Sequence, residues 1–148
     1  VLVGKETAYT EKIRTFVKAE KLEARVHILH SIPFTDLPAV YQCAEIFVYP
    51  SRYEGFGIPI LEALNSKLPV VAATGSCLEE AGGPDSLYVN PDSVEEMAQA
   101  INKAMQPTQR DYMIEKGLAW ASRFSKEQMA RQTMQCYNKL IKSGNIQQ

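Results

Sequence analysis

One stretch of the chain decides its fold, residues 45–73, which read EIFVYPSRYEGFGIPILEALNSKLPVVAA. It opens with a strand of β-branched and aromatic residues, EIFVYP, and continues into a loop that contains Gly55 and Gly57. Pro59 marks the start of a helix, because its missing N–H does no harm in a first helical turn. The strand LPVVAA follows, and it is too apolar to alternate, as in a parallel sheet covered on both faces. The stretch therefore predicts a strand–loop–helix–strand unit of an α/β fold.

The rest of the chain continues this alternation. Short strands are expected at residues 1–3, 25–29 and 86–90, and helices at 7–21 and 36–44. Three helices fill the last third, the first and last of them capped by Ser93 and Ser125. Their apolar stripes are Val94, Met97, Ala98, Ile101 and Met105; Met113, Ile114, Gly117, Leu118 and Ala121; and Met129, Ala130, Thr133, Met134, Tyr137, Leu140 and Ile141. The pattern predicts a doubly wound parallel α/β sheet with a helical C-terminal end, and such sheets bind ligands at the carboxyl ends of their strands.

Composition limits the functions open to the chain. Its 148 residues suffice for one domain with a core, so we treat residues 1–148 as a single domain. The formal net charge of -1 gives no general attraction to nucleic acid or anionic lipid, and no apolar run approaches the roughly twenty residues of a membrane span. Three widely spaced cysteines and two histidines, His27 and His30, show no ligand spacing. We therefore expect a reduced, cytoplasmic protein without a metal site.

The two glycines of the loop lie just ahead of a helix N-terminus. Unpaired N–H groups and the helix dipole favour an anion there, and a phosphate or pyrophosphate is the natural guest. The pattern is not the dinucleotide fingerprint, since position 60 is Ile, and it is not a P-loop, which needs Gly-Lys-Ser/Thr. A tight turn that binds nothing is an equally good interpretation of the glycines alone.

Two glutamates sharpen the hypothesis of a ligand site. Glu62 lies about one turn into the predicted helix, where its carboxylate can accept two hydrogen bonds from a vicinal diol such as a ribose. Glu54 lies on the other side of the glycines and can face a group attached to the distal phosphate. A diol, a pyrophosphate and a second polyhydroxylated group make the outline of a nucleotide-sugar. On spacing alone, a first-turn acid at Glu62 and a solvated loop charge at Glu54 remain open.

The motifs SRYEGFGIPILEALNSKLPVVAA, GSCLEEAGG and LYVNPDSVEEMAQAI closely resemble the C-terminal, nucleotide-sugar-binding half of retaining glycosyltransferases. These enzymes have the GT-B architecture of two Rossmann-like domains and form glycosyltransferase family 4, also called glycosyl transferases group 1. The resemblance covers nearly all of the chain, from VLVGK to the RFSKEQMARQTMQCY helix. The signature of the family is two glutamates separated by seven residues around a Phe-Gly step, and the segment from Glu54 to Glu62 matches it fully.

The resemblance implies roles for the matching residues. Glu62 would hold the ribose hydroxyls, and Glu54 would be the catalytic residue, close to the transferred sugar. The remaining donor-binding set is Gly55, Phe56, Gly57 and Ile58, through backbone N–H groups toward the diphosphate, and Ile32, packed against the base. Glu80 aligns with a common glutamate of the family and is expected to be structural. No cofactor and no metal ion is expected.

Two residues depart from the family pattern. Lys67 stands where a glycine usually ends the helix, and a left-handed cap there would be costlier by roughly 1 kcal/mol. His30 stands at another position where the family often has glycine, which changes the expected contact with the base; a half-exposed histidine without a ligand is the other interpretation.

The resemblance also implies residues and a domain of the full-length enzyme that lie outside this sequence. The family's Arg and Lys that clamp the diphosphate precede VLVGK, and an N-terminal domain carries most contacts with the acceptor, a glycan or a lipid-linked sugar. We therefore expect a fragment that is inactive in isolation. The last helix, Ser125 to about Ile141, would pack toward that domain, so its apolar stripe should be partly exposed. Many relatives work at the inner membrane face, so peripheral association of the full-length protein fits the family.

The function implied is transfer of a sugar, with retention of configuration, from a nucleoside diphosphate sugar to an acceptor hydroxyl, as in the biosynthesis of bacterial envelope polysaccharides. Two alternatives stay open. One is a nucleotide-sugar enzyme of GT-B architecture that does not transfer, such as an epimerase, and the other is a non-catalytic α/β binding module. The substitution Glu62→Ala should abolish nucleotide binding in the transferase and be silent in the binding module.

Overall fold

Parallel strands and intervening helices build two sheets, one in each of the two units into which the chain divides, Val1–Val40 and Tyr41–Gln148. The computed structural model describes residues 1–143. In the first unit, β1 (Leu2–Val3) pairs in parallel with β2 (Ile28–Leu29), and α1 (Ala8–Ala19) connects them. The helix α2 (Leu37–Gln42) contains the point of division.

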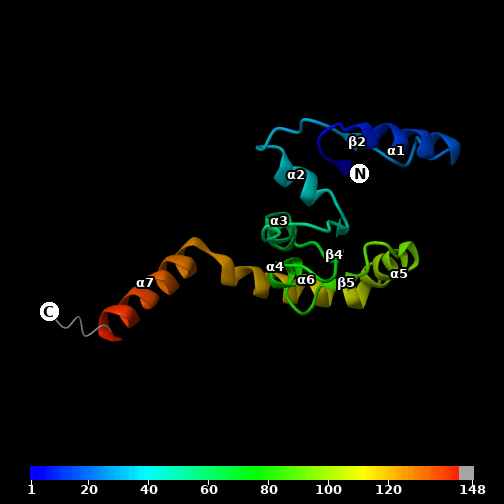
Figure 1. Ribbon diagram of the computed structural model, residues 1–148. Helices are drawn as coiled ribbons and strands as arrows, with labels where there is room; N and C mark the ends of the chain where they lie inside the picture. Colours follow the sequence, from blue (N-terminus) through cyan, green and yellow to red (C-terminus); the bar gives the residue numbers. More distant parts are fainter. Residues whose placement is uncertain (144–148) are drawn as a thin grey trace. The chain divides into compact units, whose positions relative to one another are not determined.

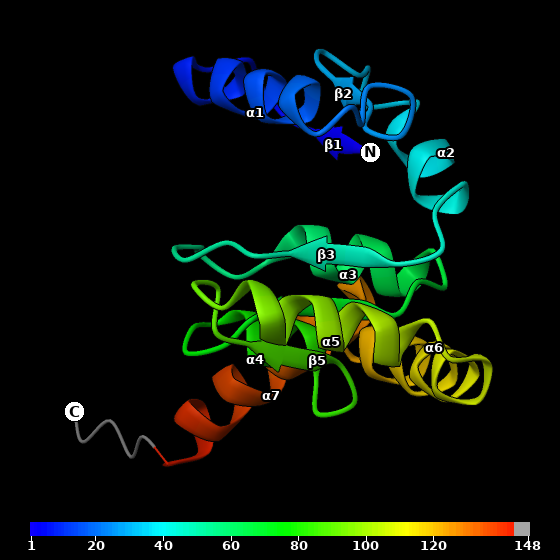
Figure 2. The same cartoon turned by 90° about the vertical axis from the view of Figure 1, so that its right-hand side faces the viewer.

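The second unit holds a three-stranded parallel sheet with the strand order β3-β4-β5. Its elements are β3 (Phe47–Tyr49), α3 (Ile58–Asn65), β4 (Val70–Ala73), α4 (Leu78–Gly82), β5 (Leu87–Val89), α5 (Val94–Ala104), α6 (Pro107–Ala121), the short 3-10 helix η1 (Ser122–Phe124) and α7 (Lys126–Ser143). The register pairs Val48 with Val71 and Val71 with Leu87. Figure 2 shows β3 leading into the long loop that returns to α3. Every predicted strand and helix of the sequence therefore exists, although most are shorter than predicted.

Helices cover both faces of this sheet, with α3 and α4 on one side of β4 and α5 on the other (Figure 1). On the α5 face, a cluster consists of Val71, Ala100, Ala104 and Met113, with Leu87 and Val89 packed against it. On the opposite face, the Tyr88 hydroxyl reaches α4 and donates to the Gly83 carbonyl oxygen at 2.7 Å. All four residues of β4 are buried, and each buried valine contributes about 1.5–3 kcal/mol. The predicted parallel sheet with helices on both faces is confirmed.

The helix α5 buries a different set of residues from the one predicted. Val94 is 76% exposed, whereas Ala100 and Ala104 are in the core. Both alanines lie on the side of α5 that packs against β4 and β5, where a small side chain lets helix and strand approach closely. The predicted apolar stripe was therefore wrong at Val94 and missed the two alanines. The prediction weighed how much apolar area each side chain could bury, and not how closely it could fit against the strands.

The predicted capping box of α5 is half present. The Ser93 hydroxyl accepts a hydrogen bond from the Glu96 N–H at 3.2 Å, as expected of an N-cap. The Glu96 carboxylate accepts from the Asn90 N–H at 3.2 Å, and the Ser93 N–H donates to the Asn90 carbonyl instead. Glu96 thus ties the helix start to the end of β5.

The helix α6 packs as predicted, with Met113, Gly117 and Ala121 buried. A Cβ atom at Gly117 would lie 2.6 Å from Leu64 Cδ2 of α3. A larger residue at position 117 would therefore require the Leu64 side chain to move where α6 contacts α3.

Two helices end on a lysine in the left-handed region. Lys67 follows α3 with φ +61°, and Lys21 follows α1 with φ +55°. After α3, the Leu68 N–H donates to the Ala63 carbonyl at 3.0 Å and the Lys67 N–H donates to the Leu64 carbonyl at 3.1 Å, which is the Schellman pattern. An L-residue in this conformation costs about 1–2 kcal/mol. The helix therefore keeps a left-handed cap at Lys67, where the sequence has no glycine.

The helix α7 begins at a serine cap and exposes an apolar face. The Gln128 N–H donates to the Ser125 hydroxyl at 3.1 Å. The exposed apolar residues of the helix are Met129, Met134, Tyr137, Leu140 and Ile141. The prediction of a partly exposed stripe is confirmed. Over residues 1–143, no helix is both long enough and apolar enough to cross a bilayer.

Candidate functional site

The loop between β3 and α3 turns at Gly57, which is the N-cap of α3 with φ +104°. A Cβ atom at this position would lie 2.9 Å from Leu78 Cδ2 and 3.3 Å from Ala81 Cβ, both on α4. Only glycine satisfies the backbone angle and the close approach together. The turn that starts α3 is therefore held against α4 by packing.

Gly55 does not share this requirement. Nothing lies within 4 Å of a Cβ atom built on it, and it is not among the glycines with positive φ. Of the two loop glycines, Gly57 alone is therefore required by its backbone angle and its surroundings, whereas the neighbours of Gly55 leave room for a side chain.

Three consecutive backbone N–H groups at the start of α3 have no hydrogen-bond partner in the described residues. Within the described part of the chain, the N–H groups of Phe56, Gly57 and Ile58 donate no hydrogen bond, and Pro59 has no N–H. The Gly57 carbonyl already accepts the first helical bond, from the Ile60 N–H at 2.9 Å. Three unpaired N–H groups next to the positive end of the helix dipole suit an anionic oxygen.

Glu54 is half-buried, and two hydroxyl groups hold its carboxylate. Its Oε1 accepts hydrogen bonds from the Tyr49 hydroxyl at 2.5 Å and from the Ser51 hydroxyl at 2.9 Å. Burial raises the pKa of Tyr49 to about 12, and the hydrogen bond to Glu54 adds to the shift. The phenol therefore stays protonated and donates at neutral pH. A solvated loop charge, the alternative for Glu54, does not describe this residue.

Glu62 is held in the same way from another element. Its Oε2 accepts a hydrogen bond from the hydroxyl of Tyr41 at 2.9 Å. Burial first, and this bond second, raise the pKa of Tyr41 well above its usual value. Glu62 lies beyond the first turn of α3, which contains no acidic residue. The alternative of a first-turn acid favoured by the dipole is therefore excluded.

An aromatic row joins the two glutamate-holding tyrosines, and sequence reasoning missed it. The ring centroids of Tyr41 and Phe47 lie 5.5 Å apart, and those of Phe47 and Tyr49 lie 5.6 Å apart. Phe47 and Tyr49 share one face of β3 because they are two residues apart in a strand. That spacing is visible in the sequence; the contact of Tyr41 with Glu62, across 21 positions, is not.

Phe56 and Cys77 fasten the loop to the rest of the unit. The Phe56 ring lies edge-on to Phe124 of η1 at 5.5 Å, and Phe124 lies 6.3 Å from Trp120. The Cys77 thiol donates to the Glu54 carbonyl oxygen at 3.1 Å. Ile58, at the helix start, is 63% exposed and therefore open to a ligand.

Ile32 belongs to the first unit, where it is half-buried after β2. Its neighbour Ser31 has φ +57°, so the left-handed position lies at Ser31 and not at His30. The His30 ring contacts the Gly4 carbonyl oxygen through Nδ1 at 2.9 Å and the Arg14 guanidinium through Nε2 at 3.4 Å. Both ring nitrogens thus have partners within this unit, which favours the interpretation without a ligand.

The structural glutamate of the GSCLEEAGG segment is Glu79, not Glu80. Glu79 accepts hydrogen bonds from the Thr74 hydroxyl at 2.7 Å and from the Gly75 N–H at 3.0 Å, and these bonds lower its pKa. Glu80 is exposed and contributes its backbone carbonyl, which accepts from Trp120 Nε1 at 3.1 Å. The expectation of a structural Glu80 side chain is therefore wrong, because the neighbouring carboxylate occupies the turn.

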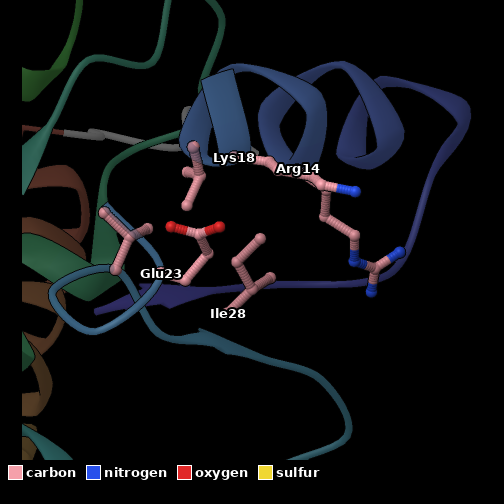
Figure 3. A pocket seen from close by; sticks show the side chains of 6 residues that line it. Arg14, Lys18, Glu23 and Ile28 are labelled. Carbon is pink, nitrogen blue, oxygen red and sulfur yellow. The ribbon is translucent and has the colours of Figure 1, made fainter. Parts of the chain in front are cut away.

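A surface pocket of about 360 Å³ lies in the first unit between α1 and β2, lined by Arg14, Val17, Lys18, Glu23, Val26 and Ile28. In Figure 3 the Glu23 carboxylate points into the pocket and the Arg14 guanidinium points away from it. Arg14 is paired with Glu6, at 2.5 Å, and with Glu11. Arg14 is thus engaged by two carboxylates, and Lys18 and Glu23 are the other charged residues of the pocket lining.

Residues 1–143 contain no cluster of three or more His, Cys, Asp or Glu side chains arranged to hold a metal ion. Cys43, Cys77 and Cys136 are free thiols.

The chain is similar to several known proteins. The family described as "Glycosyl transferases group 1" matches residues 1–107. The chain is 39% identical over 119 residues to the O-antigen chain mannosyltransferase B of Escherichia coli, which covers 80% of this chain and 31% of that protein. It is 35% identical over 106 residues to the O-antigen chain mannosyltransferase RfbU of Salmonella typhimurium, a match that covers 72% of this chain and 30% of that protein.

Among solved structures, the chain resembles Anabaena Alr3699/HepE in complex with UDP and glucose, with a TM-score of 0.81 and 26% identity over 94% of this chain and 40% of that one. The chain spans about three tenths of the length of the two mannosyltransferases.

Proposed function

The chain belongs to the group 1 family of glycosyl transferases, and from that premise we propose that it forms the donor-binding part of a retaining glycosyltransferase. The enzyme would move a sugar from a nucleoside diphosphate sugar to an acceptor hydroxyl. The reaction needs a site for a diol, a diphosphate and a sugar in sequence, and the β3–α3 loop offers groups suited to each.

One observation carries the proposal: both glutamates beside the glycine turn have one carboxylate oxygen fixed and the other available. Tyr49 and Ser51 donate to Oε1 of Glu54, and Tyr41 donates to Oε2 of Glu62. In the described chain neither of the remaining oxygens has a partner. The free oxygen of each carboxylate is therefore able to accept hydrogen bonds from the hydroxyl groups of a ligand.

The roles follow from the chemistry of each group. Glu62, on the helix, would accept hydrogen bonds from the ribose hydroxyls. The N–H groups of Phe56, Gly57 and Ile58 would donate to the diphosphate. Glu54, on the loop, would hold the transferred sugar and stabilise the positive charge that develops on it. We assign Glu54 orientation and electrostatic stabilisation, not nucleophilic attack.

Departure of the nucleoside diphosphate leaves negative charge that must be stabilised. The N-terminus of α3 carries the equivalent of about half a positive charge, which would stabilise a diphosphate bound at the N–H groups of Phe56, Gly57 and Ile58. This arrangement supports a reaction that needs no metal ion. In the full-length enzyme, basic residues outside the present sequence would add to this stabilisation, and Ile32 would pack against the base.

The names of the relatives indicate the substrate class. Two of them are O-antigen chain mannosyltransferases. We therefore propose mannose as the transferred sugar and a growing bacterial surface polysaccharide as the acceptor. The free thiols fit a cytoplasmic enzyme, where the full-length protein would meet a lipid-linked acceptor at the inner membrane face.

Ligand-induced thermal stabilisation tests the proposal. The chain and the full-length enzyme are heated with UDP, GDP and ADP and with their mannose and glucose conjugates. A ligand at about 100 times its Kd adds roughly 2.7 kcal/mol, which raises Tm by about 5–10 °C for a chain of this size. The expected result is a shift with one base, lost in Glu62→Ala and kept in the control Glu80→Gln, whose carboxylate is exposed.

A shift that survives Glu62→Ala would contradict the role of Glu62. No shift with any nucleotide in the full-length enzyme would refute the proposed function. Incubation of the bound donor with acceptor polysaccharide then separates transfer from epimerisation, because only transfer lengthens the polysaccharide.

A further inference from the structure

The two carboxylates of the site each accept a hydrogen bond from a tyrosine. The Tyr49 hydroxyl and the Tyr41 hydroxyl are the donors to Glu54 and Glu62, and the Phe47 ring lies between the two phenol rings. Tyr41 is buried, and Phe47 and Tyr49 are half-buried. The row therefore fixes two side chains that come from different elements, a loop and a helix.

We propose that Tyr49 and Tyr41 are positioning residues with separate tasks: Tyr49 orients Glu54 for sugar transfer, and Tyr41 orients Glu62 for nucleotide binding. The inference rests on the proposed function. It assigns to the aromatic row a role in the reaction beyond its contribution to packing.

The geometry favours positioning over simple packing. Tyr49 and Ser51 both donate to the same oxygen of Glu54, which restrains the carboxylate and leaves the second oxygen free to accept from a ligand. An unrestrained glutamate on a loop would sample several rotamers, and misplacement of a reacting group by about 1 Å can cost a hundredfold in rate.

The chemistry of the donor matters as well. A phenol is a neutral donor, so it orients the carboxylate without cancelling its negative charge. A lysine or arginine at the same place would form an ion pair and weaken the attraction of Glu54 for a positively charged sugar. The high pKa of Tyr49, about 12, keeps this donor protonated over the whole physiological range.

Tyrosine-to-phenylalanine substitutions in the full-length enzyme test the inference, because each removes one hydroxyl and keeps the ring. For Tyr49→Phe we expect kcat to fall at least tenfold while the Kd for the nucleoside diphosphate changes less than twofold. For Tyr41→Phe we expect the Kd to rise about tenfold, with a smaller effect on kcat at saturating donor. These sizes are of the order expected for a lost hydrogen bond to a charged group.

Tyr88→Phe is the matched control. The Tyr88 hydroxyl also donates one hydrogen bond inside the same unit, to the Gly83 carbonyl oxygen at 2.7 Å, but it contacts neither glutamate. It should lower stability and leave both kcat and Kd at the wild-type values. A purely structural role for Tyr49 and Tyr41 predicts that all three variants behave alike.

A double-substitution cycle completes the test. Because Tyr49 acts through Glu54, Tyr49→Phe should have little further effect in a Glu54→Gln background. If Glu54→Gln and Glu62→Ala reduce activity and binding but Tyr49→Phe and Tyr41→Phe match the control, the inference is overturned and the proposed function stands. If the glutamate substitutions themselves are silent, the proposed function fails, and the inference fails with it.

Discussion

The substitution Gly57→Ala should destabilise the second unit strongly, whereas Gly55→Ala, two residues earlier in the same loop, should not. At Gly57 the backbone has φ +104°, which costs an alanine about 1–2 kcal/mol. The new Cβ would also meet Leu78 Cδ2 at 2.9 Å and Ala81 Cβ at 3.3 Å, and overpacking of this kind costs about 1–3 kcal/mol. Alanine also lowers the conformational entropy of the unfolded chain, which offsets about 0.4–1 kcal/mol of this loss of stability. The net loss is about 3 kcal/mol.

Gly55→Ala carries neither penalty, because its Cβ would enter open space and its φ is not positive. Because of the same entropy effect, the stability of the Gly55→Ala variant should equal that of the wild type or exceed it by up to about 1 kcal/mol. The two variants change the same atoms in the same loop, so their difference isolates the conformation and packing of Gly57.

Urea unfolding followed by tryptophan fluorescence measures the difference. Trp120 is the one tryptophan of the sequence, and it lies in the second unit, where it packs on Gly83. At an m-value of about 2 kcal/mol/M, Gly57→Ala should lower the midpoint by about 1.5 M. Equal midpoints for the two variants would refute the reasoning. Rescue of Gly57→Ala by a smaller residue at Leu78 would show that overlap outweighs backbone strain.

Three further predictions concern caps and titration. Lys67→Gly should stabilise the chain by about 0.5–1 kcal/mol in urea unfolding, because glycine relieves the left-handed strain, whereas Lys67→Ala should give no gain. Ser93→Ala should lower stability by about 1 kcal/mol through the lost hydrogen bond to the Glu96 N–H, and Ser93→Asp should retain it. Burial raises the pKa of Tyr49 and of Tyr88 to about 12, while unfolded phenols ionise near 10, so stability should be intact below pH 10 and fall between pH 10 and 12. Tyr49→Phe and Tyr88→Phe should each flatten that fall, and an unchanged slope would contradict the assignment.

The elements of the fold could be predicted from sequence because their signals are local. Pro59 at a helix start and Ser125 as a cap act within one turn, and the apolar run of β4 marks a strand buried on both faces. The exposed Val94 and the buried Ala100 show the limit of such signals. A hydrophobic stripe records which residues can be buried, whereas the neighbouring strands decide which of them fit.

The residues of the candidate site likewise differ in how far the sequence alone could predict them. Glu54, Gly57 and Glu62 stand out because their spacing matches one loop and one helix. The tyrosine donors could not be predicted, since Tyr41 meets Glu62 only after α2, β3 and α3 have packed together. The positive φ of Ser31 was likewise not predicted, because backbone angles in a turn depend on hydrogen bonds that the sequence does not reveal.

The fastening of the loop at two points, Gly57 against α4 and Phe56 against Phe124, has a thermodynamic consequence for the ligand. The turn is ordered when the unit folds, so binding does not have to immobilise it and loses little chain entropy on that account. On the proposed function, a donor that fits would gain the full value of its contacts, and one that does not fit would meet a surface that resists adjustment. Selectivity at this turn would then be a property of the rigid scaffold, set before any ligand arrives.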